Sequence, residues 1–214
     1  MLDNREPIII QGGMGAGVSG WRLARAVSET GQLGVVSGTA LDVVLARQLQ
    51  LGDPAGHARR AMAEFPLAGV AERVLDRYFI EGGKAAGAPF RAVPLLSPQP
   101  ARERLELLVL ANFVEVYLAR EGHDGLVGVN SLEKIQLPTL PSLFGAMLAG
   151  VDYVLMGAGI PRTIPGILDS LARGDAVELP YHVEGARPDE EYVTRFDPVE
   201  FCAGQLPWLV RPKF

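Results

Sequence analysis

The sequence predicts an α/β fold built on parallel strands, and three observations lead to this prediction. An apolar strand, a glycine-rich turn, a helix and a second apolar strand follow one another within residues 7–38. Apolar residues also occur in unbroken runs, such as residues 8–10 and 153–156, which is typical of strands buried on both faces. Finally, the tetrapeptide Met-Gly-Ala-Gly occurs at residues 14–17 and again at 156–159, each time after an apolar strand and shortly before a helix.

The N-terminal part of the chain contains the first strand–helix–strand unit. Residues 7–11 form the first expected strand, and a helix with one apolar face is expected over residues 21–30. Gly31 is the expected end of this helix, and residues 33–37 form the next expected strand. Because a helical crossover joins the two strands, we expect them to be parallel.

A mainly helical segment, residues 41–120, interrupts this alternation. Apolar periodicity predicts helices over residues 41–51, 66–79 and 101–120. Pro100 directly precedes the last of them and suits the first turn of a helix. The segment is long for a single crossover between strands, so we interpret it as a helical insertion that covers part of the fold.

The alternation of strands and helices resumes after this insertion. The expected elements are strands at residues 126–130 and 153–156 and helices at residues 141–149 and 165–173. The tail is acidic and rich in turn residues, with candidate hairpin strands at residues 181–185 and 191–196. Its carboxylates are too dispersed for the tight oxygen cluster of a metal site, so no metal is expected.

Length, charge and cysteine content limit the classes of function. A chain of 214 residues fits one domain, which we expect to span residues 1–214. The net charge of −5 provides no general attraction to nucleic acid, so no nucleic-acid partner is expected. The single cysteine, Cys202, cannot form an internal disulfide, which fits a reducing compartment. No histidine or lysine lies near it in sequence, so we expect a small core residue rather than a nucleophile.

The sequence gives no sign of export or of a membrane span. The first residues are polar and include two acids, unlike a signal peptide. The longest apolar span, residues 144–160, contains Asp152 and is too short to cross a bilayer as a helix. We therefore expect a cytoplasmic protein without a membrane partner.

The glycine-rich turn of residues 15–20 suggests nucleotide binding, but its surroundings argue against it. The stretch GAGVSG has the spacing of the dinucleotide fingerprint, which also needs an acidic residue at the end of the next strand. Residues 37–39 are Ser-Gly-Thr instead. A P-loop does not fit either, because Trp21 and Arg22 follow the last glycine. Two interpretations remain: a tight turn between strand and helix, or a backbone whose amides approach a flat ligand such as a flavin.

The repeated tetrapeptide is what stacked β/α units of a barrel produce, because their loops gather at one rim. Two longer stretches point to a family. Residues 7–38 (PIIIQGGMGAGVSGWRLARAVSETGQLGVVSG) and 125–172 (GLVGVNSLEKIQLPTLPSLFGAMLAGVDYVLMGAGIPRTIPGILDSLA) resemble the nitronate monooxygenase family, formerly the 2-nitropropane dioxygenases. These are FMN-dependent TIM-barrel oxidoreductases, and the resemblance extends to the enoyl reductase-like subgroup of fatty-acid synthases. It implies the N-terminal part of a (β/α)8 TIM barrel, with residues 41–120 as a helical insertion.

The resemblance also implies which residues contact the flavin. The first-strand loop would lie along the flavin ring, and the asparagine that ends the third barrel strand would contact the cofactor. Two further side chains follow that asparagine and lie within reach of the same rim. The residues expected to bind FMN are Gly12, Gly13, Met14, Gly15, Asn130, Lys134 and Gln136. An asparagine at a strand end is also a common turn former, so both roles stay open for Asn130.

The later part of the sequence departs from the family's pattern. Family members carry a Gly-Gly-His motif, whose histidine is linked to proton abstraction, and late glycine-rich loops that bind the FMN phosphate; neither is present. His57, His123 and His182 stand in other settings and are expected to be surface or loop residues, so no catalytic residue is assigned. About four barrel strands are expected, whereas closure needs eight. This predicts an incomplete barrel, the N-terminal half.

Two classes of function follow. The first is an FMN-dependent oxidoreductase with a small-molecule substrate, which oxidises alkyl nitronates with O2 or acts on an activated C–C double bond as enoyl reductases do. The chain alone would then be catalytically incomplete. The second is a non-catalytic, barrel-derived module that works with a partner supplying the second half of the barrel. In both cases an uncovered sheet face is expected to favour self-association or binding of that partner.

Overall fold

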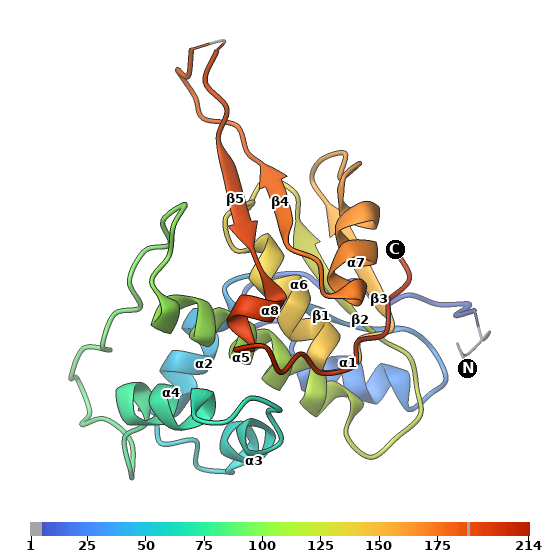
Figure 1. Cartoon of the computed structure of the whole chain (residues 1–214). Helices are drawn as coiled ribbons and strands as arrows, with labels where there is room; N and C mark the ends of the chain where they lie inside the picture. The colour runs from blue at the N-terminus through green and yellow to red at the C-terminus, as the bar shows by residue number, and fades with distance from the viewer. Residues whose placement is uncertain (1–5, 188) are drawn as a thin grey trace.

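The computed structural model describes residues 6–187 and 189–214 and shows a mixed α/β fold with a parallel sheet (Figure 1). The sheet consists of β1 (Gly34–Ser37), β2 (Val127–Leu132) and β3 (Tyr153–Gly157), which lie side by side in chain order. Both neighbouring pairs are parallel. The predicted order and direction of these strands are therefore confirmed.

One isolated bridge at each edge extends the parallel arrangement. Ile10 pairs with Leu33, which precedes β1, and Lys213 pairs with Tyr153 in β3. The strand predicted at residues 7–11 is thus reduced to a single bridge, and that prediction was too long. The segment pairs on one side only and its side chains find little cover, since Ile8 is 91% exposed.

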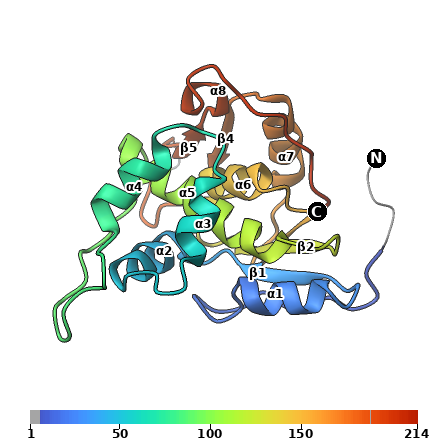
Figure 2. The same ribbon diagram turned by 90° about the horizontal axis from the view of Figure 1, so that it is seen from below.

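Helices cover one face of the sheet, with α1 (Trp21–Ser28) and α5 (Arg102–Arg120) in contact with its strands. The other described helices are α2 (Leu41–Gln50), α3 (His57–Ala63), α4 (Val70–Tyr78), α6 (Thr139–Leu148), α7 (Ile164–Arg173) and α8 (Pro198–Phe201). Figure 2 shows α1 directly against β1. Gly34 permits this approach, because a Cβ atom there would lie 1.8 Å from the carbonyl oxygen of Ala24. No described helix is both long and apolar enough to span a membrane.

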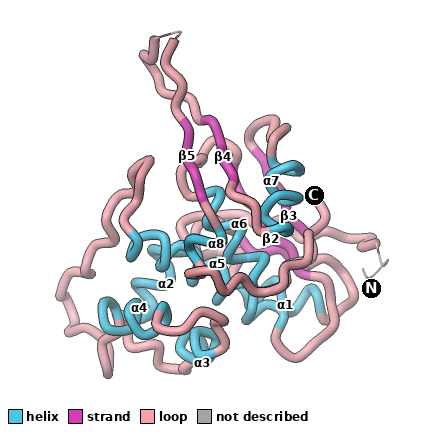
Figure 3. The backbone as a smooth tube through the Cα atoms, viewed as in Figure 1, coloured by secondary structure: helices cyan, strands magenta, loops and turns pink. Residues whose placement is uncertain are grey.

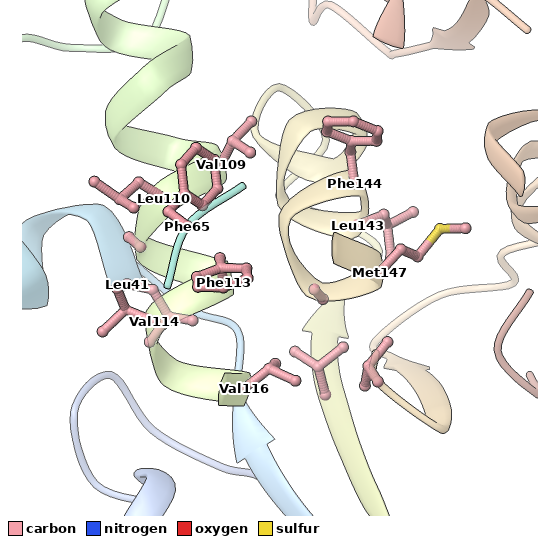
Figure 4. Packing of buried hydrophobic residues seen from close by; sticks show 14 of the residues in the cluster. Leu41, Phe65, Val109, Leu110, Phe113, Val114, Val116, Leu143, Phe144 and Met147 are labelled. Atoms are coloured by element: carbon pink, nitrogen blue, oxygen red, sulfur yellow. The ribbon is translucent and has the colours of Figure 1, made fainter. Parts of the chain in front are cut away.

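The main core surrounds α5, whose buried residues lie on all sides of the helix, as expected for a central helix. Figure 4 shows Leu110, Phe113 and Val114 of α5 beside Leu41 and Phe65. The rings of Phe65 and Phe113 meet edge to face at 5.0 Å, a favourable aromatic geometry. This core fixes the insertion, residues 41–120, against the helix-covered face of the sheet.

The opposite face of the sheet carries a second, smaller apolar cluster. Leu33, Val35 and Leu126 form it, and Tyr153 and Leu155 pack against it. All five residues belong to strands or to the segments directly before them. This face is therefore apolar, and no side chain from a described helix belongs to its cluster.

Three local predictions were wrong. Helix α3 was not expected; the buried Asp53 carboxylate supports it by accepting hydrogen bonds from two amides of its first turn. Helix α4 begins at Val70, not at residue 66. The tail hairpin, which projects from the body in Figure 3, pairs β4 (Val177–Pro180) with β5 (Val193–Phe196). Its first strand precedes the predicted residues 181–185, because the alternating burial that anchors the hairpin lies over β4.

Candidate functional site: a glycine loop at the carboxyl edge of the sheet

The loop of residues 12–19 lies beyond the carboxyl end of β1 and is closed by one serine. The Ser19 hydroxyl accepts a hydrogen bond from the Met14 amide at 3.1 Å and donates one to the Gly12 carbonyl at 3.3 Å. The Ser19 carbonyl in turn accepts a hydrogen bond from the Ser37 amide at 2.8 Å. Sequence reasoning assigned no role to Ser19, although it lies inside the fingerprint-like stretch. The loop is thus built before any ligand arrives.

Asn130 ties this loop to the neighbouring strand. Its Nδ2 atom donates a hydrogen bond to the Gly13 carbonyl at 2.8 Å and lies 3.9 Å from the Met14 sulfur. Asn130 lies opposite Ser37 in the register of β1 and β2, so both strands end at the same edge. The structure therefore brings Gly12, Gly13, Met14, Gly15 and Asn130 together, as expected if they form one site.

The loop offers backbone donors. Within the described residues, the amides of Gly13 and Gly15 form no hydrogen bond, whereas the Met14 amide is used by Ser19. Gly15 has a positive φ of 78°, a conformation that glycine adopts without strain. The amides of Gly12, Ala16 and Gly17 likewise form no hydrogen bond within the described residues. These free amides and the oxygen of Asn130 form a neutral set of hydrogen-bonding groups. Such a set suits a flat, polar-edged ring better than it suits a charged group.

The glycines of the loop serve different purposes. Gly13 is buried, and an added Cβ would lie 2.7 Å from the Val36 oxygen and 2.8 Å from Val35 Cγ1. Its lack of a side chain is therefore explained by contact with β1, without any ligand. Gly12 is exposed, and an added Cβ would meet only Met14 Cγ at 3.9 Å. Gly12 is thus the position where a side chain would change the loop surface without disturbing the fold.

A carboxylate occupies the N-terminus of the helix that follows the loop. The Trp21 amide of α1 donates a hydrogen bond of 2.6 Å to Glu115 Oε1. Glu115 is 8% exposed; burial raises the pKa of its carboxyl, and the Trp21 hydrogen bond and the charge of Arg22 offset this only in part. In a dinucleotide-binding fold this helix end would hold a pyrophosphate. Glu115 fills that place, which agrees with the sequence argument against a nucleotide fingerprint.

Lys134 and Gln136 lie elsewhere. Both line a cavity of about 470 Å³ whose lining contains neither Asn130 nor residues 12–15. Gln136 donates a hydrogen bond to Glu133 at 3.3 Å and accepts one from the His182 amide at 3.4 Å. The structure therefore divides the expected cofactor-binding residues into two groups, the loop with Asn130 and the cavity with Lys134 and Gln136.

The histidines and the cysteine make contacts away from the loop. His57 packs edge-on against Trp21, the His123 ring contacts the Ala119 carbonyl and the Gly125 amide, and His182 lies beside Gln136. Burial raises the pKa of the Cys202 thiol to about 11, and Arg102 counteracts this only in part, so the thiol is un-ionised near neutral pH. Among the described residues, no group of three or more metal-ligating side chains gathers.

The second tetrapeptide does not copy the loop's geometry. In residues 14–17, Gly15 and Gly17 have positive φ, whereas in residues 156–159 Ala158 does, at 62°.

Comparisons with protein-family models, with curated proteins and with solved structures found no match.

Proposed function

We propose that this chain is the flavin-ring-binding part of an FMN-dependent oxidoreductase of the nitronate monooxygenase type, built as the N-terminal part of a (β/α)8 barrel. The observation that carries the proposal is the glycine loop, which Asn130 holds at the carboxyl edge of the parallel sheet and in which the amides of Gly13 and Gly15, among others, form no hydrogen bond within the described residues. Barrel enzymes bind their ligands at this edge.

The sheet itself supports a barrel. Five segments of the chain lie side by side, in chain order and parallel to one another: the segment at Ile10, then β1, β2 and β3, and finally the segment at Lys213. A doubly wound sheet would instead reverse its strand order at the binding crevice. Helices line one face, while the cluster on the other face is apolar and formed by strand-side residues alone. That is the distribution expected when one face becomes the interior of a barrel.

The described residues fit a flavin ring better than they fit its phosphate. The free amides of Gly13 and Gly15 are donors for the oxygen and nitrogen atoms of the ring, and Asn130 Oδ1 is an acceptor for a ring N–H. A phosphate would gain from the end of α1, but Glu115 already occupies it with a carboxylate. These residues would therefore hold and orient the ring, and the phosphate would depend on other groups.

The bound cofactor would supply the oxidation of an alkyl nitronate, with O2 as the final electron acceptor. This chain's residues would position the ring: the loop amides would bind one polar edge, and the Asn130 carboxamide would fix the loop and the ring together. An enoyl reductase-like activity would use the same ring contacts.

Titration of the purified chain with riboflavin and with FMN tests the proposal. We expect the fluorescence of both ligands to be quenched on binding. The two dissociation constants should agree within about threefold, a difference in binding free energy of less than about 1 kcal/mol. A phosphate site would separate them, because one hydrogen bond to a charged group contributes about 1.5–3 kcal/mol.

A pair of glycine variants locates the bound ring. Gly12→Val places a side chain on the exposed loop surface and should weaken riboflavin binding at least about tenfold by displacing the ring. Gly166→Val is the matched control, because an added Cβ at Gly166 of α7 meets nothing within 4 Å and the one at Gly12 meets only Met14 Cγ at 3.9 Å. No saturable riboflavin binding by the unchanged chain, or equal binding by Gly12→Val and the control, would contradict the assignment.

A further inference from the structure

A cavity of about 470 Å³ lies on the helix-covered side of the sheet, next to the carboxyl ends of β1 and β2. Its volume falls within the range of small-molecule sites. The first turns of α2 and α6 border it, and α5 forms one wall through Arg104, Leu108 and Asn112. Much of the remaining lining is apolar and consists of Leu41, Val43, Leu96, Leu132, Ile135, Leu137 and Pro138. The cavity shares no lining residue with the glycine loop of residues 12–19.

Asn112 gives the cavity an acceptor that lacks a donor. The residue is 1% exposed, and its Nδ2 atom donates a hydrogen bond to the Leu108 carbonyl at 2.9 Å. This contact fixes the orientation of the amide, because a carbonyl accepts and cannot donate. The Oδ1 atom is fully buried and has no partner within the described residues. Buried polar atoms without a partner are rare and costly, so this oxygen points to a missing donor.

Arg104 also lines this cavity and carries a charged donor that lacks an acceptor. Its Nη2 atom pairs with the Asp42 carboxylate, and its Nε atom donates a hydrogen bond to the Pro94 carbonyl at 2.9 Å. The Nη1 atom is buried and has no partner within the described part of the chain. Asp42 balances the Arg104 charge, so the exposed Lys134 leaves the lining with a positive excess.

The surrounding backbone adds to this preference for an anion. No side chain caps the N-terminus of α2 or that of α6, and both first turns line the cavity. Helix N-termini carry a partial positive charge that favours anionic groups. Arg104 and Asn112 are eight residues apart on α5, which places them on one side of the helix and roughly 12 Å apart along its axis.

We propose that this cavity binds an elongated amphipathic carboxylic acid that carries a hydroxyl or amide donor at its other end. The carboxylate would accept a hydrogen bond from Arg104 Nη1, and Lys134 would add a positive charge to the lining. The apolar body would lie along Leu108 and the other aliphatic residues of the lining. The far O–H or N–H group would donate to Asn112 Oδ1.

Calorimetric titration with three probe ligands of equal chain length tests the proposal: 10-hydroxydecanoate, decanoate and 1-decanol. We expect 10-hydroxydecanoate to bind at least about tenfold more tightly than decanoate, because only it provides a donor for a buried acceptor. It should exceed 1-decanol by a similar factor, because the alcohol lacks the carboxylate. Equal affinities for the two acids, or no binding of either, would overturn the proposal. Equal affinities would mean that a water molecule already donates a hydrogen bond to Asn112 Oδ1.

The variant Asn112→Leu separates recognition from folding. It removes the unpartnered oxygen while keeping a buried side chain of similar size, so the variant should still bind decanoate as the unchanged chain does. Its preference for the hydroxy acid should disappear. Retention of that preference would overturn the role of Asn112, and loss of decanoate binding with unchanged circular dichroism would overturn the assigned orientation.

A competition experiment separates this site from the proposed flavin site. The affinity for 10-hydroxydecanoate should be the same in the presence and absence of saturating riboflavin, because the two sets of residues do not overlap. Competitive displacement would show that the cavity is part of the flavin site and would overturn the proposal of a second site.

Discussion

Replacing Gly13 by alanine tests whether contact with β1 sets the shape of the glycine loop. The new Cβ atom would lie 2.7 Å from the Val36 carbonyl oxygen and 2.8 Å from Val35 Cγ1. Val36 is paired with Val129 of β2, so its carbonyl cannot move away without disturbing the pairing of β1 with β2. The same substitution at Gly12 meets only Met14 Cγ at 3.9 Å, an ordinary van der Waals contact.

The expected difference in stability follows from this comparison. Overpacking a tight site costs about 1–3 kcal/mol, and each 1 kcal/mol lowers the melting temperature of a chain of this size by roughly 2–4 °C. Gly13→Ala should therefore melt roughly 2–12 °C below the unchanged protein. Gly12→Ala should melt at the same temperature or slightly higher, because alanine at a compatible site stabilises by about 0.4–1 kcal/mol.

Thermal unfolding followed by circular dichroism, with urea unfolding as a second measurement, distinguishes the two variants. The urea midpoint should shift without a change in slope if only native-state packing is affected. Equal melting temperatures for Gly12→Ala and Gly13→Ala would refute the reasoning, because they would show that Gly13 is not held against β1. A flavin-contact experiment at Gly13 would be confounded by this packing, which is why Gly12 carries that test.

Three further outcomes are expected. Because burial gives Glu115 a raised pKa in the folded state, the unfolded chain loses this proton first, and stability should fall as pH rises above the ordinary value of 4.5. Glu115→Gln should remove that part of the pH dependence when the free energy of unfolding is measured by urea titration at pH 5 and 7. An unchanged difference between the free energies at the two pH values would refute this expectation. The thiol of Cys202, with a pKa of about 11, should react with a thiol reagent at pH 7.5 only on unfolding; rapid labelling of the native protein would contradict its burial. Ile8→Lys should reduce self-association in analytical ultracentrifugation, since Ile8 is 91% exposed, and an unchanged sedimentation profile would exclude this residue from the contact.

The sheet could be predicted from the sequence because its signals are local. Unbroken apolar runs define the strands. The first helix ends at Ser28, earlier than the predicted residue 30, and Gly31 lies in the turn that follows with a positive φ of 79°. The order of the strands follows from short crossovers between sequential neighbours. The N-terminal strand was overestimated for the same reason: residues 8–10 have the composition of a buried strand, but only Ile10 forms a bridge.

Features that depend on distant contacts could not be predicted. Helix α3 depends on the Asp53 carboxylate, which reaches forward to amides five and six residues later. Glu115 meets Trp21 across 94 residues of sequence, so nothing near Trp21 indicates that its helix end is occupied. The first strand of the hairpin precedes the predicted residues 181–185 because the alternating burial of Val177 and Leu179 anchors it.

The separation of the expected cofactor residues into two groups has a simple physical cause. Successive side chains of a strand point to opposite faces of the sheet. At the end of β2, Asn130 contacts Gly13 on the face that carries the helix-free cluster, and the next residue, Ser131, lines the cavity beside α5. Lys134 and Gln136 follow on the cavity side, so sequence proximity to Asn130 did not place them in the same site. The proposed flavin site and the proposed carboxylic-acid site would thus lie on opposite faces at the end of one strand, with neutral backbone groups on one face and a positively charged, partly apolar cavity on the other.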